Sequence, residues 1–136
     1  MILIDTGPLV ALIDRSDPNH QRVATILRTL SADSFVTTLP CFTEAMYFLG
    51  KEKGYFAQQF LWKMRRSGKL ILHTLSEEEL DRMEVLMQKY SDLPMDIADA
   101  SLVVIAETLR LKRIFTLDDH FRAYRVHDSE ALFVFP

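Results

Sequence analysis

Short apolar runs alternate along the chain with longer segments of helical periodicity. The runs end at turn or capping residues, which is typical of buried strands, and they cover residues 1–4, 35–39, 70–75, 113–117 and 132–135. Between them, helical spacing predicts helices over residues 9–13, 18–30, 40–48, 55–66, 76–90 and 95–109. This alternation predicts an α/β fold with a mostly parallel sheet of four to five strands, flanked by helices on both faces.

Local residues mark several of the expected helix ends. Pro8 and Pro40 suit the first position of a helix, because a proline there forfeits no helical hydrogen bond. The segment 76–79 has the Ser-x-x-Glu pattern of a capping box, and its acids are typical of a solvated helix start. Gly50 and Gly54 indicate a break between two helices.

Composition limits the class of protein. The 136 residues are 49% hydrophobic and 26% charged, so we expect one folded domain over residues 1–136. The net charge of -3 argues against a basic coat for nucleic acid. The lone cysteine, Cys41, excludes an internal disulfide framework and fits a reducing cytoplasm. The longest uncharged stretch, residues 34–43, is too short to span a membrane, so we expect a cytoplasmic protein.

Four acids far apart in sequence are predicted to meet at one edge of the sheet. Asp5 and Asp118 each follow a predicted strand, and the carboxyl ends of parallel strands share an edge. Glu44 lies near the start of the helix after the second strand, at the same edge. Asp99 lies near the start of a crossover helix that runs antiparallel to the strands, so this acid also reaches that edge.

Converging carboxylates repel one another and raise one another's pKa unless a cation neutralises them. Oxygen ligands suit hard ions such as Mg²⁺ or Mn²⁺, and we expect Asp5, Asp99 and Asp118 to be the ligands. Such an ion activates water and stabilises the leaving oxygen of an in-line displacement. The arrangement therefore favours phosphodiester hydrolysis, with Glu44 as the fourth catalytic acid.

Each acid taken alone also has a structural interpretation. Asp5 and Asp118 can cap a helix or begin a turn, and Glu44 can be a solvated helix acid. Asp96 near a helix start is interpreted as a partner of the helix dipole rather than a ligand. Asp99 needs a partner, because the helix that follows it is almost wholly apolar. The joint placement of the four acids carries the catalytic hypothesis.

Basic and aromatic residues concentrate in the middle of the chain. Residues 51–69 carry six Lys or Arg and one acid, and we expect Lys63, Arg65 and Arg66 to contact RNA. The alternative is a solvated helix end. Half of the 14 aromatic residues fall within residues 42–62, which suits a helical arm with a groove for a partner, although each ring alone can be core.

Four parts of the chain together resemble the PIN-domain nucleases, over essentially the whole sequence. They are Ile4-Asp5-Thr6, Glu44, Leu93-Pro94-Met95-Asp96-Ile97-Ala98-Asp99-Ala100 and Thr116-Leu117-Asp118-Asp119-His120-Phe121. Within that family the chain is similar to the VapC-type toxins of toxin–antitoxin pairs.

The resemblance implies Mg²⁺- or Mn²⁺-dependent cleavage of RNA by an endonuclease. It places Asp5, Glu44, Asp99 and Asp118 in the active site, with Thr6, Thr116 and Asp96 beside them. It also implies the strand order 3-2-1-4-5, a homodimer and an inhibitory antitoxin that is encoded next to the toxin. Family members without toxin pairing are the alternative within the same fold.

Two other classes of protein remain open at this point. A phosphatase with an aspartyl nucleophile can use Asp5, but the haloacid-dehalogenase type needs a second acid where this chain has Gly7. A non-catalytic RNA-binding module does not need the four acids. Stabilisation by Mn²⁺ distinguishes a nuclease from such a module.

Overall fold

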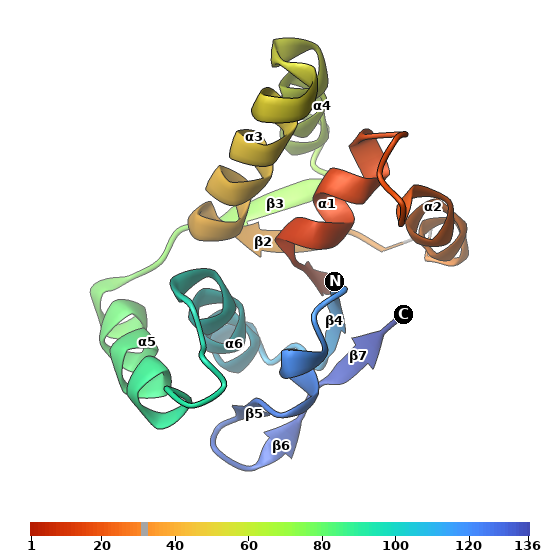
Figure 1. The fold of residues 1–136 in the computed structure, drawn as a ribbon. Coiled ribbons are helices and arrows are strands. Elements are labelled where there is room, and N and C mark those ends of the chain that lie inside the picture. Colours follow the sequence, from red (N-terminus) through yellow and green to blue (C-terminus); the bar gives the residue numbers. More distant parts are fainter. Residues whose placement is uncertain (31–32) are drawn as a thin grey trace.

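A single parallel sheet organises the computed structural model, which describes residues 1–30 and 33–136. Its strands are β1 (Ile2–Ile4), β2 (Phe35–Thr38), β3 (Leu70–His73), β4 (Arg113–Phe115) and β7 (Phe133–Phe135). They lie in the order β3-β2-β1-β4-β7, and every neighbouring pair is parallel (Figure 1). The expected order 3-2-1-4-5 is confirmed, because β7 is the C-terminal run expected as the fifth strand.

Six helices surround the sheet in the described part of the chain. They are α1 (Thr6–Ile13), α2 (His20–Thr29), α3 (Leu39–Lys53), α4 (Tyr55–Arg66), α5 (Glu77–Lys89) and α6 (Ile97–Leu109). Among the described residues, no helix has the length and apolar character that crossing a membrane requires.

Alternation along the strands divides the core between the two faces of the sheet. In β1, Leu3 belongs to an apolar cluster with residues of α5 and α6, whereas Ile2 and Ile4 pack with residues of α1, α3 and α4. Both clusters are fully buried at these strand positions. The prediction of a sheet covered on both faces is therefore confirmed.

Several helix boundaries differ from the expectation, and those of α6 and α3 show why. Helix α6 begins at Ile97 rather than at residue 95, because Asp96 is its N-cap and accepts the Asp99 N–H at 2.8 Å. Helix α3 continues through Gly50 to Lys53, so the break falls at Gly54 alone, where φ is +69°. Gly50 is therefore not a breaker.

Glu79 is not the solvated acid that its charged neighbours predict. It is only 8% exposed and completes the capping box of α5 with Ser76. Its carboxylate also contacts His73 Nε2 of β3 at 3.0 Å and accepts the Thr108 hydroxyl of α6 at 2.9 Å. The expected capping box is confirmed, but Glu79 additionally ties α5 to a strand and a second helix.

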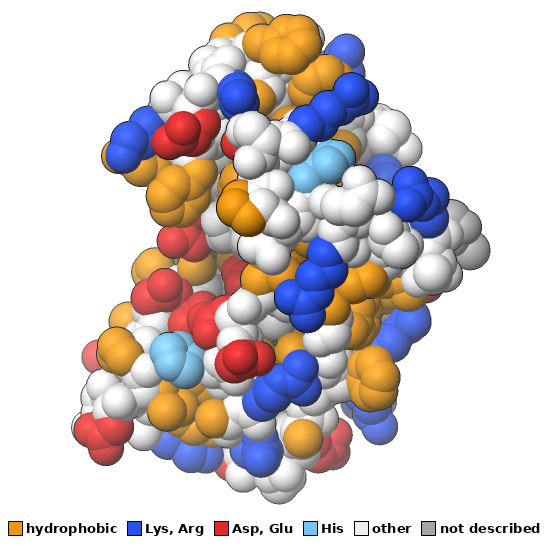
Figure 2. Space-filling view, turned by 45° about the vertical axis from the view of Figure 1, so that its right-hand side comes forward, with side chains coloured by type: hydrophobic (Ala, Val, Ile, Leu, Met, Phe, Trp, Pro, Cys, Tyr) orange, Lys and Arg blue, Asp and Glu red, His pale blue; other side chains and the backbone are white. Residues whose placement is uncertain are grey.

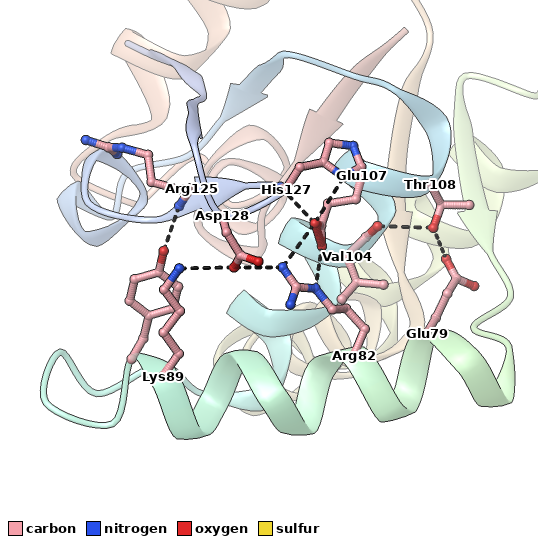
Figure 3. A network of polar contacts seen from close by, with 10 residues as sticks. Glu79, Arg82, Lys89, Val104, Glu107, Thr108, Arg125, His127 and Asp128 are labelled. Atoms are coloured by element: carbon pink, nitrogen blue, oxygen red, sulfur yellow. Dashed lines mark hydrogen bonds and ion pairs between the residues drawn. The ribbon is translucent and has the colours of Figure 1, made fainter.

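A small hairpin that the sequence did not predict follows β4. A 3-10 turn (Asp119–Arg122) leads into β5 (Arg125–Val126), which pairs antiparallel with β6 (Glu130–Ala131). Arg82 of α5 donates to Glu107 of α6 at 3.0 and 3.2 Å and to Asp128 of the hairpin at 3.0 Å (Figure 3). Lys89 reaches the same Asp128 oxygen at 3.0 Å, so the hairpin is fastened to both helices.

Candidate active site

The four candidate acids line one cavity at the carboxyl edge of the sheet. The cavity has a volume of about 630 Å³, and its lining includes Asp5, Glu44, Asp96, Asp99 and Asp118. Figure 2 shows acidic side chains gathered where this face of the molecule is hollowed. The structure thus brings together side chains from a strand end, two helix starts and the loop after β4.

Asp5 lies at the bottom of this group and is held on both of its oxygens. As the N-cap of α1 it accepts the Thr6 N–H at 2.7 Å, and its second oxygen accepts the Thr116 hydroxyl at 2.7 Å. Burial raises the pKa of Asp5 to about 6, with smaller contributions from the charges of Asp118 and Glu44 and opposition from the two hydrogen bonds.

Asp99 projects from the first turn of α6 and is also buried. Its Oδ2 accepts the Tyr124 hydroxyl at 3.1 Å, and the Asp96 N–H lies farther away at 3.4 Å. Burial raises the pKa of Asp99 to about 7, and the charges of Asp96 and Asp5 add to the shift. The pKa values of two of the four acids therefore lie well above the ordinary value of an aspartate.

The hydroxyls of Thr6 and Thr116 connect the acids to one another. Thr6 donates to Glu44 Oε1 at 3.0 Å, while its N–H is the donor to Asp5. Thr116 donates to Asp5 and accepts the Asp118 N–H at 3.0 Å. Thr6 and Thr116 therefore each contact two of the four candidate acids.

Cys41 lies beneath the site and has the character of a buried apolar residue. Its Sγ is 3.9 Å from Asp5 Oδ1 and 3.8 Å from the Ala98 carbonyl oxygen. Burial, followed by the negative charge of Asp5, raises the pKa of the Cys41 thiol to about 12. The thiol therefore stays protonated at neutral pH and is not a nucleophile.

The donor chemistry of the cavity fits a hard divalent cation. Glu44 Oε2, Asp99 Oδ1 and Asp118 Oδ2 accept no hydrogen bond from the residues that the structure describes. Burial and, to a smaller extent, neighbouring negative charges raise the pKa values of Asp5 and Asp99, and a bound cation would offset both effects. Among the described residues, no group of three or more His, Cys, Asp or Glu side chains is arranged closely enough to hold a metal ion.

The predicted RNA contacts lie outside the acidic cavity. Lys63, Arg65 and Arg66 are exposed in the last turn of α4. Lys63 lines a second, larger groove of about 1100 Å³ with Phe56 and Phe60. The two hollows have Asp14 and Ser16 in common, so they are continuous along the surface. A bound chain can therefore run from the basic end of α4 to the acids.

Sequence reasoning missed Tyr124 as a member of the site. Its ring is fully buried and its hydroxyl is the nearest donor to Asp99. Burial, then the charge of Asp99 and this hydrogen bond, raise the pKa of Tyr124, so the group stays a donor. The one available signal was that a buried Asp99 needs a partner, which does not reveal where in the sequence that partner lies.

Comparisons with known proteins agree with this geometry. The family model described as the PIN domain matches residues 2–126. Ribonuclease VapC26 of Mycobacterium tuberculosis is 31% identical over 125 residues, which cover 91% of this chain and 92% of that protein.

Three solved structures share the fold at lower sequence identity. VapC20 of Mycobacterium tuberculosis, described as a sarcin–ricin loop cleaving toxin, superimposes with a TM-score of 0.80 at 15% identity, covering 90% of this chain and 94% of its own. A toxin–antitoxin complex from Klebsiella pneumoniae gives 0.61 at 22% identity, with 87% of each chain covered. VapBC2 from Rickettsia felis, bound to a DNA fragment from its promoter, gives 0.68 at 16% identity, with coverages of 99% and 98%. The chain belongs to the PIN-domain family and is a homologue of the VapC ribonuclease toxins.

Proposed function

We propose that this protein is a VapC-like endoribonuclease, the toxin of a toxin–antitoxin pair, which hydrolyses RNA phosphodiester bonds with Mg²⁺ or Mn²⁺. The observation that carries the proposal is the convergence of Asp5, Glu44, Asp99 and Asp118 in one cavity. The relative named a ribonuclease supports RNA as the substrate. We further propose that residues 1–136 act as one cytoplasmic domain.

Asp5, Asp99 and Asp118 are the residues that would hold the metal ion. When bound, the ion supplies positive charge for the phosphate and lowers the pKa of a water molecule. The chain itself fixes Asp5 through Thr6 and Thr116, so that carboxylate cannot rotate freely. Glu44 is tied to the same framework by the Thr6 hydroxyl and lines the cavity as the fourth acid.

The second groove supports an antitoxin as the protein partner. Helices α3 and α4 lie side by side and project from the sheet as an arm (Figure 1). The exposed aromatic rings of this arm are Tyr47, Phe48, Tyr55, Phe56, Phe60 and Trp62. Phe56 and Phe60 line the groove, whereas the Trp62 ring packs against Phe42 at 5.1 Å between centroids. An antitoxin peptide in this groove would extend toward the acids and bring its own cations to them. A homodimer is part of the same proposal.

The function is tested with protein purified free of antitoxin. It should cut structured RNA in Mg²⁺ or Mn²⁺ and stop when EDTA is added. Asp118→Asn should abolish cleavage, whereas Asp119→Asn is the matched control, because its side chain is 93% exposed and it makes the same change of charge one residue away. Equal cleavage in EDTA, or full activity of Asp118→Asn, would contradict the proposal.

A further inference from the structure

Tyr124 makes a polar contact that packing alone does not require. The residue is 0% exposed, and its ring meets Phe121 and Tyr90 edge-on, with centroids 5.2 and 5.1 Å apart. Its hydroxyl donates to Asp99 Oδ2 at 3.1 Å. A phenylalanine would fill nearly the same volume, so what the hydroxyl adds to the packing is its hydrogen bond to Asp99.

The Tyr124 hydroxyl is the nearer of the two donors to Asp99 Oδ2. The other donor to Oδ2, the Asp96 N–H, is 3.4 Å away and therefore contributes little. Asp5, in contrast, is held by donors at 2.7 Å on both oxygens. With Oδ2 held by tyrosine, Asp99 Oδ1 is left without a hydrogen bond from the described residues and is free to bind a cation.

Tyr124 is itself held by the hairpin that follows it. The next residue, Arg125, donates its backbone N–H to the Tyr90 hydroxyl at 3.0 Å. Asp128 at the tip of the hairpin is bound by Arg82 and Lys89 of α5 (Figure 3). The backbone around Tyr124 is therefore fixed to α5, and the ring is clamped between two other aromatic rings.

We propose that Tyr124 is a positioning residue, which holds the Asp99 carboxylate in the orientation that binds the metal ion. The inference rests on the proposed function, because it assigns a role toward the same metal. Loss of a group that orients a ligand typically weakens metal affinity or activity by about 10- to 100-fold. Tyr124→Phe should therefore weaken Mn²⁺ binding by about that factor while the ring contacts persist.

The experiment is a calorimetric titration with Mn²⁺ in the absence of RNA, on the parent, Tyr124→Phe and Thr108→Val. Thr108→Val is the matched control, since it also removes a hydroxyl that donates to a buried carboxylate, but that carboxylate belongs to Glu79, which does not line the acidic cavity. It should leave the Mn²⁺ affinity within about twofold of the parent, as expected for a group that does not orient a ligand. Circular dichroism checks that each variant is folded.

Cleavage kinetics supply a second, independent readout. At low Mn²⁺, Tyr124→Phe should lower kcat and leave the KM for RNA unchanged, and raising Mn²⁺ should restore kcat. Equal Mn²⁺ affinity of Tyr124→Phe and the parent would overturn the role of Tyr124, as would a lowered kcat that Mn²⁺ does not restore. A parent protein that binds no Mn²⁺ would instead contradict the proposed metal-dependent function.

Discussion

Asp99 carries a charge that destabilises the folded protein at neutral pH. Its pKa rises from 3.8 to about 7 on folding, chiefly because the group is buried and then because Asp96 and Asp5 are close. The folded state thus binds the proton more tightly than the unfolded state. Stability therefore falls as the pH rises from about 4 to about 7, the interval between the two pKa values.

Asp99→Asn should remove this loss of stability between pH 4 and pH 7, because asparagine does not ionise. In EDTA at pH 8, we expect the variant to be more stable than the parent by up to about 4 kcal/mol, the equivalent of the rise in pKa from 3.8 to about 7. At pH 4 the difference should vanish, since the parent is then protonated as well. Urea unfolding at both pH values measures the difference, and a loss of stability at pH 8 would contradict it.

Asp5→Asn provides the comparison for this prediction. The pKa of Asp5 is also raised, to about 6, so relief of charge stabilises this variant too. However, both Asp5 oxygens accept hydrogen bonds at 2.7 Å, and an amide keeps only one acceptor. The gain at pH 8 should therefore be smaller than for Asp99→Asn, and equal gains would mean that hydrogen bonding at Asp5 is unimportant.

Binding of Mn²⁺ should depend on pH because protons compete for the same carboxylates. Asp5 and Asp99 are protonated at pH 5 and largely ionised at pH 8. Millimolar Mn²⁺ should therefore raise the unfolding temperature of the parent more at pH 8 than at pH 5, and EDTA should reverse the effect. Differential scanning fluorimetry measures it. An equal shift at both pH values would show that the ion binds elsewhere.

Sequence reasoning located some of these residues and not others. Asp5 could be placed because it follows an apolar strand directly, and topology then determines where it lies. Tyr124 lies in an irregular segment without periodicity, and its partner is 25 residues away. Glu79 was misjudged because its charged neighbours indicate solvent, whereas its burial is decided by His73 and Thr108 on other elements.

Among the secondary-structure elements, the turn between α3 and α4 depends on one glycine. Gly54 has φ +69° and ψ -164°, a conformation that is essentially restricted to glycine. Gly54→Ala should destabilise the protein by about 1–3 kcal/mol through backbone strain, although no atom lies within 4 Å of the added Cβ. Urea unfolding of the two proteins measures the loss.

Gly50→Ala is the control for this prediction, because Gly50 lies within α3. A Cβ there would meet the Gln58 amide, which donates to the Met46 carbonyl at 2.9 Å. The Gln58 amide can move away, and losing its hydrogen bond costs about 1 kcal/mol. Alanine is more favourable than glycine within a helix by a similar amount, so the two effects offset each other. Gly50→Ala should therefore leave the stability nearly unchanged. A loss of stability as large as that of Gly54→Ala would show that the effect at Gly54 does not come from its positive φ.

The elements themselves were largely predictable, because helical periodicity marks α5 and α6 and short apolar runs mark β1, β2, β3 and β4. The β5–β6 hairpin was not, since its strands have two residues each. Its turn uses His127 and Asp128 at positive φ instead of a glycine, so it lacks the usual sequence signal. Its stability comes from Arg82 and Lys89, which no local pattern reveals.

On the scale of the whole molecule, the candidate acids and the basic end of α4 line different hollows. The net charge is -3, yet the acids of the active site and the basic end of α4 lie in two continuous hollows. An acidic cavity repels RNA until its charge is neutralised, so affinity for the phosphate backbone must come from elsewhere on the surface. The candidates are the exposed Lys63, which lines the connected groove, and its neighbours Arg65 and Arg66 in the last turn of α4.

Neutralising Lys63, Arg65 and Arg66 to Gln should weaken RNA binding and flatten its dependence on salt. If each side chain contacts one phosphate, the slope of log affinity against log salt should fall in magnitude by about 2, because fewer counterions are released. Fluorescence anisotropy measures the slope, in an Asp118→Asn background that leaves the RNA uncut. Arg110→Gln with Lys112→Gln is the control, since both residues are exposed just before β4, at the opposite end of that strand from Asp118. This control should leave the slope unchanged. An unaltered slope in the triple variant would mean that the basic end of α4 is a solvated helix end, and RNA would then have to be held by another surface.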